Sequence, residues 1–182
     1  AEVLGMDVGR VDDDALYREM VVNYGQALDG RTIEPGQVLM ICPDDNDVVT
    51  RLQPLINWRM RKGYQVHLAT TAETGTTNLL IKAYIQSRYD NPSTRPEYVV
   101  LVGDATQPYS IPTWFEELSG YGGEGDNPYV LLDGDDPLPE AHICRLSFAS
   151  LTELEAIVNK IVGYESTPFV SDPSWYTRAC LV

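Results

Sequence analysis

Cysteine and histidine are scarce in this sequence, which has three cysteines and two histidines among 182 residues. Cys42, Cys144 and Cys180 each lie in an apolar segment. A nucleophilic thiol needs a polar, electropositive and partly exposed setting, so we expect all three cysteines to be small buried residues. Their odd number and apolar surroundings also give no reason to expect a disulfide framework.

The two histidines, His67 and His142, give little support for a catalytic or metal site. His142 and Cys144 alternate along an apolar segment that favours a strand, so their side chains are expected to share a face. A single pair at that spacing is more often part of the core than a catalytic dyad. We therefore assign no catalytic residue in this chain.

Basic residues are also few: 13 Lys and Arg stand against 27 Asp and Glu, and the net charge is −14. Such a field repels phosphate backbones and anionic lipids, so neither nucleic acid nor a membrane is an expected partner. No apolar run approaches the roughly 20 residues that span a bilayer. With 43% hydrophobic residues, the sequence predicts one soluble domain with a sizeable core.

The two ends of the sequence indicate that it is part of a longer protein. The first residues do not combine a basic segment with an apolar one, so no signal peptide is recognised in this chain. Residues 176–182 alternate and then become apolar, like a strand that the chain enters without leaving. We expect essential residues to follow Val182.

Apolar runs and helical spacing alternate through the middle of the sequence. Strands are predicted at residues 38–42, 64–69 and 98–102. Helices are predicted between them, one ending at Gly63 and one beginning at Thr76 or Thr77. This order makes two right-handed crossovers, and it predicts an α/β fold class, a three-layer sandwich with a mainly parallel sheet.

The remaining segments are less regular. Residues 105–128 are rich in glycine, proline and aromatic residues without a clear period, and a connection of this length is usually functional or covers an edge. Short strands are predicted at residues 129–132 and 141–146, and a short helix at residues 15–28. Ser150 and Glu153 form a capping box that predicts the start of an amphipathic helix.

Several segments, in this order and spacing, resemble the gingipain-type cysteine peptidases, peptidase family C25. They are residues 55–63 (LINWRMRKG), 98–104 (YVVLVGD), 126–129 (DNPY), 134–147 (GDDPLPEAHICRLS), 158–161 (VNKI) and 164–165 (YE). The resemblance implies a caspase-like fold built from two side-by-side subdomains. Residues 37–182 resemble the first of these, subdomain A, and residues 1–36 are then a lead-in segment.

The resemblance also implies where the chemistry lies. In that family the catalytic histidine, the cysteine nucleophile and the acid of the specificity pocket follow the strand with which this sequence stops. We therefore expect this chain to be the non-catalytic first half of a secreted or cell-surface cysteine endopeptidase, and to be inactive alone. Its expected partners are the C-terminal catalytic subdomain and a protein or peptide substrate.

Structural calcium is the one site that the resemblance carries over to this chain. The matching ligands are Asp104, Asp136, the main-chain carbonyl of Leu138, and Glu140, which are hard oxygen ligands of the kind Ca²⁺ prefers. An extended strand would hold the carboxylates of Asp136 and Glu140 about 13 Å apart, so the loop must curl to bind one ion. Its two prolines restrict the free loop and favour such a bend.

Two other interpretations stay open. Asp44, Asp45 and Asp104 resemble the phosphoacceptor site of a receiver domain, although the long spacing and the long loop after Asp104 argue against it. Asp44, Asp45 and Asp47 are explained more simply as capping residues of a helix than as a second cation site. The other alternative is a non-catalytic binding or propeptide-like module.

Overall fold

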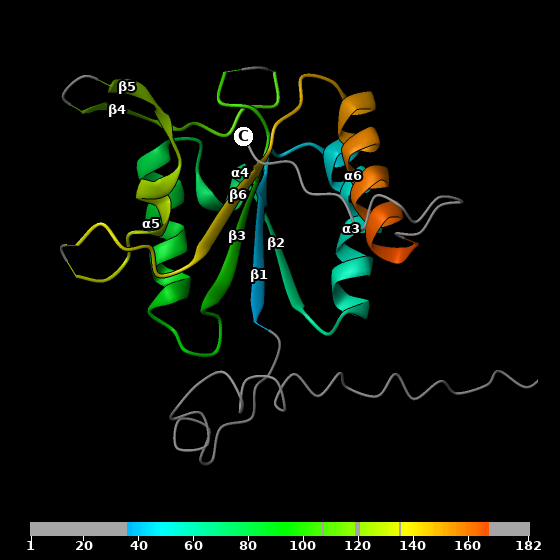
Figure 1. The fold of residues 1–182 in the computed structure, drawn as a ribbon, viewed down its shortest axis with the longest axis horizontal. Helices are drawn as coiled ribbons and strands as arrows, with labels where there is room; N and C mark the ends of the chain where they lie inside the picture. The colour runs from blue at the N-terminus through cyan, green and yellow to red at the C-terminus, as the bar shows by residue number, and fades with distance from the viewer. Residues whose placement is uncertain (1–35, 107, 119–120, 135, 168–182) are drawn as a thin grey trace, which may run out of the picture. The chain divides into compact units, whose positions relative to one another are not determined.

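A four-stranded sheet forms the centre of the computed structural model, which describes residues 36–106, 108–118, 121–134 and 136–167 (Figure 1). Its strands are β1 (Gln37–Cys42), β2 (Gln65–Thr70), β3 (Pro96–Val102) and β6 (His142–Leu146). They lie in the order β2-β1-β3-β6, and each neighbouring pair is parallel. The predicted parallel α/β sheet is confirmed.

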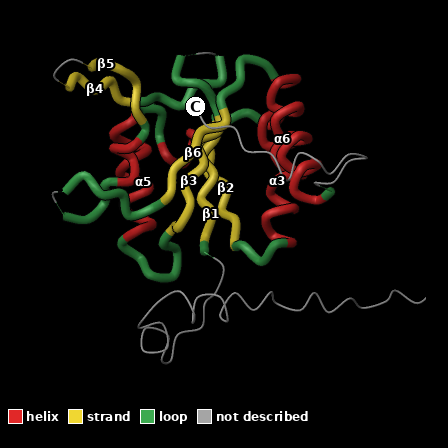
Figure 2. The backbone as a smooth tube through the Cα atoms, in the orientation of Figure 1, coloured by secondary structure: helices red, strands yellow, loops and turns green. Residues whose placement is uncertain are grey.

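Helices cover both faces of the sheet, so the described part has three layers (Figure 2). One face carries α3 (Asn46–Arg61) and α6 (Leu151–Ser166), which pack against each other. The other face carries α5 (Asn78–Tyr89) and the 3-10 helix η1 (Asn127–Val130). The short helix α4 (Thr71–Thr74) follows β2 directly.

Alternate residues of the central strands supply the two cores. On β1, Val38, Met40 and Cys42 pack on the side of α3 and α6, whereas Leu39 and Ile41 pack on the side of α5. Both faces of β1 are therefore covered, which is why its sequence is a continuous apolar run rather than an alternating one.

Side-chain caps set the starts of the main helices. Asp45 caps α3, and its carboxylate accepts hydrogen bonds from the amides of Asp47 and Val48. The hydroxyl of Ser150 caps α6 by accepting from the amide of Glu153, whose carboxylate accepts from the amide of Ala149 at 2.8 Å. The predicted capping residues thus satisfy backbone donors that a helix leaves unpaired.

The predicted strand at residues 129–132 is wrong. This segment holds the end of η1, which has a proline in its first turn, followed by a loop. Tyr129 is fully buried beneath Trp114, with ring centroids 4.5 Å apart. A short apolar run does not distinguish a strand from one buried helical turn, because both bury consecutive residues.

An antiparallel hairpin of β4 (Trp114–Leu118) and β5 (Tyr121–Gly125) lies in the segment for which the sequence predicted no regular element. Glycines make up much of β5, and glycine weakens the usual signal of a strand. The predicted helix at residues 15–28, the strand at residues 176–182 and Cys180 lie outside the described residues. Within the described part, no helix is long and apolar enough to cross a membrane.

Candidate functional site at the carboxyl edge of the sheet

Polar side chains follow the parallel strands at the carboxyl edge of the sheet, where α/β folds usually bind ligands. Asp104 follows β3 and Ser147 follows β6. The Ser147 hydroxyl donates to Asp104 Oδ2 at 2.6 Å, and the amide of Thr106 donates to Asp104 Oδ1 at 3.2 Å. These hydrogen bonds, first that from Ser147, lower the pKa of Asp104 and keep it ionised.

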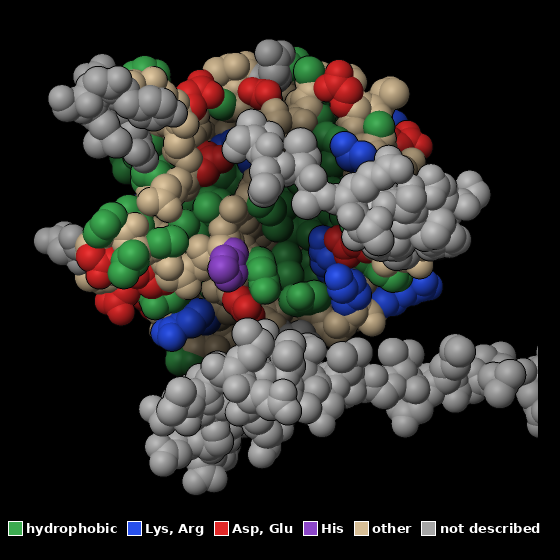
Figure 3. Space-filling view, viewed as in Figure 1, with side chains coloured by type: hydrophobic (Ala, Val, Ile, Leu, Met, Phe, Trp, Pro, Cys, Tyr) green, Lys and Arg blue, Asp and Glu red, His purple; other side chains and the backbone are tan. Residues whose placement is uncertain are grey.

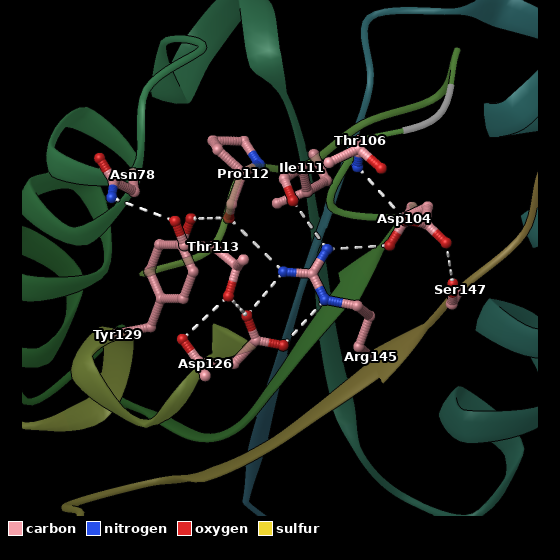
Figure 4. Close-up of polar contacts among 12 residues, drawn as sticks. Asn78, Asp104, Thr106, Ile111, Pro112, Thr113, Asp126, Tyr129, Arg145 and Ser147 are labelled. Atoms are coloured by element: carbon pink, nitrogen blue, oxygen red, sulfur yellow. Dashed lines mark hydrogen bonds and ion pairs between the residues drawn. The ribbon is translucent and has the colours of Figure 1, made fainter. Parts of the chain in front are cut away.

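A cavity of about 260 Å³ opens at this edge (Figure 4). Its wall is polar and carries both charges, with side chains from the ends of two strands, the hairpin and the loop before it. The lining side chains are those of Asp104, Ala105, Thr113, Glu124, Asp126, Arg145 and Ser147. The cavity is slightly smaller than most sites for small molecules, and its wall suits a polar group better than an apolar one.

Arg145 of β6 joins the separate parts of this wall. Its Nε and Nη2 donate to the two carboxylate oxygens of Asp126 at 2.8 and 2.7 Å. Nη1 donates to the carbonyls of Gly103 and Ile111 at 2.9 and 2.7 Å, and Nη2 lies 3.5 Å from the carbonyl of Pro112. The side chain is only 16% exposed, so these acceptors replace most of the water around its charge.

A second set of contacts fixes the groups around Asp126. Thr113 Oγ1 lies 2.8 Å from Asp126 Oδ1 and 2.9 Å from the carbonyl of Gly125. The hydroxyl of Tyr129 donates to the carbonyl of Pro112, and Asn78 Nδ2 donates to the carbonyl of Thr113. The base of the hairpin is therefore held by α5, η1 and β6 together.

The sequence analysis did not identify Arg145, although its position carried a signal. Ile143 and Arg145 are two residues apart on β6, so their side chains lie on the same face of the sheet. Ile143 packs against the core on the side of α5. An arginine at a position that faces a core needs fixed acceptors, because a buried unpaired charge is strongly destabilising. The strand pattern therefore indicated an ion pair, but not its partner.

The structure does not bring Asp104 together with the other predicted calcium ligands. Asp104 follows the carboxyl end of β3, whereas Glu140 precedes the amino end of β6. The two strands are parallel, with Tyr98 opposite His142, so these carboxylates lie at opposite ends of the sheet. Five residues of strand separate such positions by about 16 Å, and one ion cannot bind both.

The described residues of this loop, 132–134 and 136–140, do fold back on each other. Glu140 Oε2 accepts hydrogen bonds from the amides of Leu132 and Asp133, and Asp136 Oδ1 accepts from the amide of Leu138 at 2.8 Å. Among the described residues, no group of three or more His, Cys, Asp or Glu side chains is placed to hold a metal ion. The predicted site included Asp104, and calcium binding by the other predicted ligands, Asp136, Leu138 and Glu140, stays untested.

The two described cysteines differ in exposure. Cys42 is fully buried, as predicted, and burial together with Asp44 and Asp45 raises the pKa of its thiol to about 12. The prediction that Cys144 is buried is wrong, because its side chain is exposed and β6 is an edge strand within the described part of the sheet. The neighbouring ring of His142 stacks on that of Tyr98 at 5.3 Å.

A second hollow, of about 250 Å³, lies beside β6 on the face that α3 and α6 only partly cover. Figure 3 shows hydrophobic side chains open to the surface in this view. The residues that line the hollow are mostly apolar or aromatic and include Val38, Tyr64, Tyr98, Val100, His142 and Cys144. An open apolar surface beside a free strand edge is typical of an interface.

Comparison with known proteins identifies the family. The profile of peptidase family C25 matches residues 31–182. Lys-gingipain of Porphyromonas gingivalis is 33% identical over 141 residues, which are 72% of this chain and 8% of that protein. Gingipain R2 of the same species is 22% identical over 172 residues, or 92% of this chain and 22% of that protein. The chain thus spans a small part of these relatives.

Solved structures share the fold. A protease structure superimposes with a TM-score of 0.68 at 30% identity, over 79% of this chain and 31% of the other. The Arg-specific cysteine proteinase gingipain R superimposes with a TM-score of 0.60 at 19% identity, over 72% of this chain and 28% of the other. The predicted caspase-like α/β fold is confirmed. The chain belongs to peptidase family C25, the gingipain-type cysteine peptidases.

Proposed function

We propose that this chain is the non-catalytic first half of the catalytic domain of a secreted or cell-surface gingipain-like cysteine endopeptidase. The main support is the family match over residues 31–182, together with the small share of Lys-gingipain, 8%, that the chain covers. The thiols also fit this role. Cys42 is buried with a raised pKa, so it is a poor nucleophile at neutral pH.

The second half supplies the chemistry in this proposal. A thiolate polarised by an imidazole attacks the scissile carbonyl of a protein or peptide substrate, and hydrogen-bond donors stabilise the oxyanion. The first half supports that unit from the side. The surface that fits this contact is the free edge of β6 with the apolar hollow beside it, where Tyr98, His142 and Cys144 are open to a partner.

The topology indicates how the second half would join. The path from β1 through α3 to β2 crosses the sheet in one direction, and α6 covers the same face as α3. If α6 connected β6 to a new parallel strand beside β6, the connection would cross the same face of the sheet in the opposite sideways direction. Such a crossover would be left-handed, which is rare. We therefore expect the second half to dock beside β6 without adding a parallel strand to that edge through α6.

The test compares this chain alone with an intact protein that continues beyond Val182. We expect the intact protein to cleave peptides and to lose this activity after alkylation with iodoacetamide, and the chain alone to be inactive. Thiol-dependent cleavage by the purified chain alone would contradict the proposal. Lack of any cleavage by the intact protein would favour the binding or propeptide-like alternative.

We also propose that the loop of residues 132–140 binds structural calcium without Asp104. The support is chemical: Asp136 and Glu140 supply carboxylates and Leu138 a carbonyl, within a loop that the bonds of Glu140 to Leu132 and Asp133 already close. An ion at this loop would offset repulsion among its acids. Its role would be to stiffen the loop that leads into β6.

A further inference from the structure

Arg145 is placed to control the shape of the carboxyl edge. We propose that Arg145, paired with Asp126, is a positioning residue for substrate binding, because it holds the loop after β3 and the base of the β4-β5 hairpin in place. This inference rests on the proposed function as one half of a peptidase. Arg145 need not touch the substrate; it acts through the backbone that it fixes.

The contacts of Arg145 require an arginine. A guanidinium has five N–H donors in a planar fork, and the five contacts of Arg145 match that number. They reach three separate segments: the end of β3 at Gly103, the returning loop at Ile111 and Pro112, and the exit of the hairpin at Asp126. A lysine has one nitrogen and cannot reach all three segments at once.

The loop lies directly against the end of β3 and leaves no room for a side chain at Gly103. A Cβ atom on Gly103, whose φ is +147°, would lie 2.2 Å from the carbonyl oxygen of Tyr109. The amide of Ile111 donates to the carbonyl of Asp104 at 2.8 Å, and the Ile111 side chain is fully buried. Apolar burial of Ile111 thus fixes one side of the loop, and Arg145 donates hydrogen bonds to carbonyls on the other.

The outer surface of the same segments forms the cavity wall. Thr113 and Asp126 lie across the cavity from Asp104 and Ser147 (Figure 4), and Glu124 also lines it. Phe115, on the hairpin that Asp126 follows, is 66% exposed. Without the guanidinium, the carbonyls of Gly103 and Ile111 behind this wall would lose the donor that Arg145 gives them, and the carboxylate of Asp126 would keep the hydroxyl of Thr113 but lose both of its bonds to Arg145. Water would enter, and the loop and hairpin would sample other positions.

The expected effect is on binding rather than on chemistry, because the thiol and imidazole belong to the other half. In the intact peptidase, we expect Arg145→Lys to raise KM for a peptide substrate about tenfold and to change kcat by less than about twofold. Asp126→Asn retains an acceptor for Thr113 and for one arm of Arg145. We expect it to raise KM less, by about threefold.

The matched control is Glu165→Gln, which weakens another ion pair on an arginine, between α6 and Arg59 of α3, near the opposite edge of the sheet. We expect this variant to lower thermal stability and to leave KM unchanged. The inference is wrong if Arg145→Lys and Asp126→Asn change KM no more than Glu165→Gln does, or if they lower kcat alone. If Arg145→Lys does not fold, the KM of Asp126→Asn alone tests the inference. If the wild-type intact protein shows no thiol-dependent cleavage, the proposed function fails and the inference fails with it.

Discussion

Glu165 near the end of α6 holds that helix to the end of α3, and its removal should weaken the fold in a pH-dependent way. Its carboxylate accepts from Trp58 Nε1 at 2.8 Å, from both Nη atoms of Arg59 at 2.6 and 2.9 Å, and from Lys62 Nζ at 3.1 Å. Burial alone would raise the pKa of Glu165, but these donors outweigh it and lower the pKa to about 2.

The shift in pKa sets the magnitude of the effect. A pKa near 2 in the folded state against an ordinary value of 4.5 corresponds to about 3 kcal/mol if it is unscreened. The Glu165 side chain is 23% exposed and that of Lys62 is 41% exposed, so water screens part of this energy and about 1 to 2 kcal/mol is a better expectation. In a domain of this size, that loss would lower Tm by about 3 to 6 °C.

The sign follows from linkage. The pKa of Glu165 is lower in the folded state than in the unfolded state, so its contribution is complete above about pH 4.5 and disappears as the pH falls towards about 2. We therefore expect Glu165→Gln to destabilise the protein at pH 7, and the difference from the wild type to shrink between about pH 4.5 and pH 2.

Urea unfolding of both proteins from pH 7 down to the lowest pH at which they fold measures this difference. Asp47→Asn is the control, because Asp47 is 72% exposed and lies 3.6 Å from Arg51 in a surface pair on one helix. Such a pair is expected to contribute about 0.5 kcal/mol or less. A difference for Glu165→Gln that is as small as the control, or that does not depend on pH, would refute the reasoning.

Two further predictions concern the proposed calcium loop and the cysteines. EDTA should lower the Tm of this chain. Asp136→Ala should remove that sensitivity to EDTA, whereas Asp104→Ala should keep it, because Asp104 lies at the other end of the sheet. An unchanged Tm in EDTA would count against the calcium site. In a Cys180→Ser background, a thiol reagent such as DTNB should label exposed Cys144 well before buried Cys42. Equal rates would mean that β6 or the core is more open than the structure indicates.

The parallel sheet and its helices were predictable because they depend on local pattern. The apolar run of β1 follows from burial on both faces, and the caps at Asp45 and Ser150 follow from backbone donors that every helix must satisfy. Edges are harder to predict. Cys144 is exposed because no described strand lies beyond β6, and the composition of β6 itself does not reveal its place in the sheet.

The candidate site was less predictable because it depends on contacts between distant segments. The sequence alone did not place Asp104 and Glu140 at opposite ends of parallel strands, which is a consequence of the register of β3 and β6. The partners of Arg145 are likewise set by the path of a loop that has no period. The strand pattern could have predicted only that Arg145, as a charge facing the core, would need hydrogen-bond acceptors.

The return of α6 to the face that α3 covers has a consequence for synthesis. Among the described residues, the last one that contributes to either hydrophobic cluster is Val162 in α6. Each strand of the described sheet thus has its neighbouring strands and its covering helices within residues 37–166. Under the proposed function, this segment has the contacts it needs to fold during translation, and it would offer the side of β6 as a formed surface to the second half.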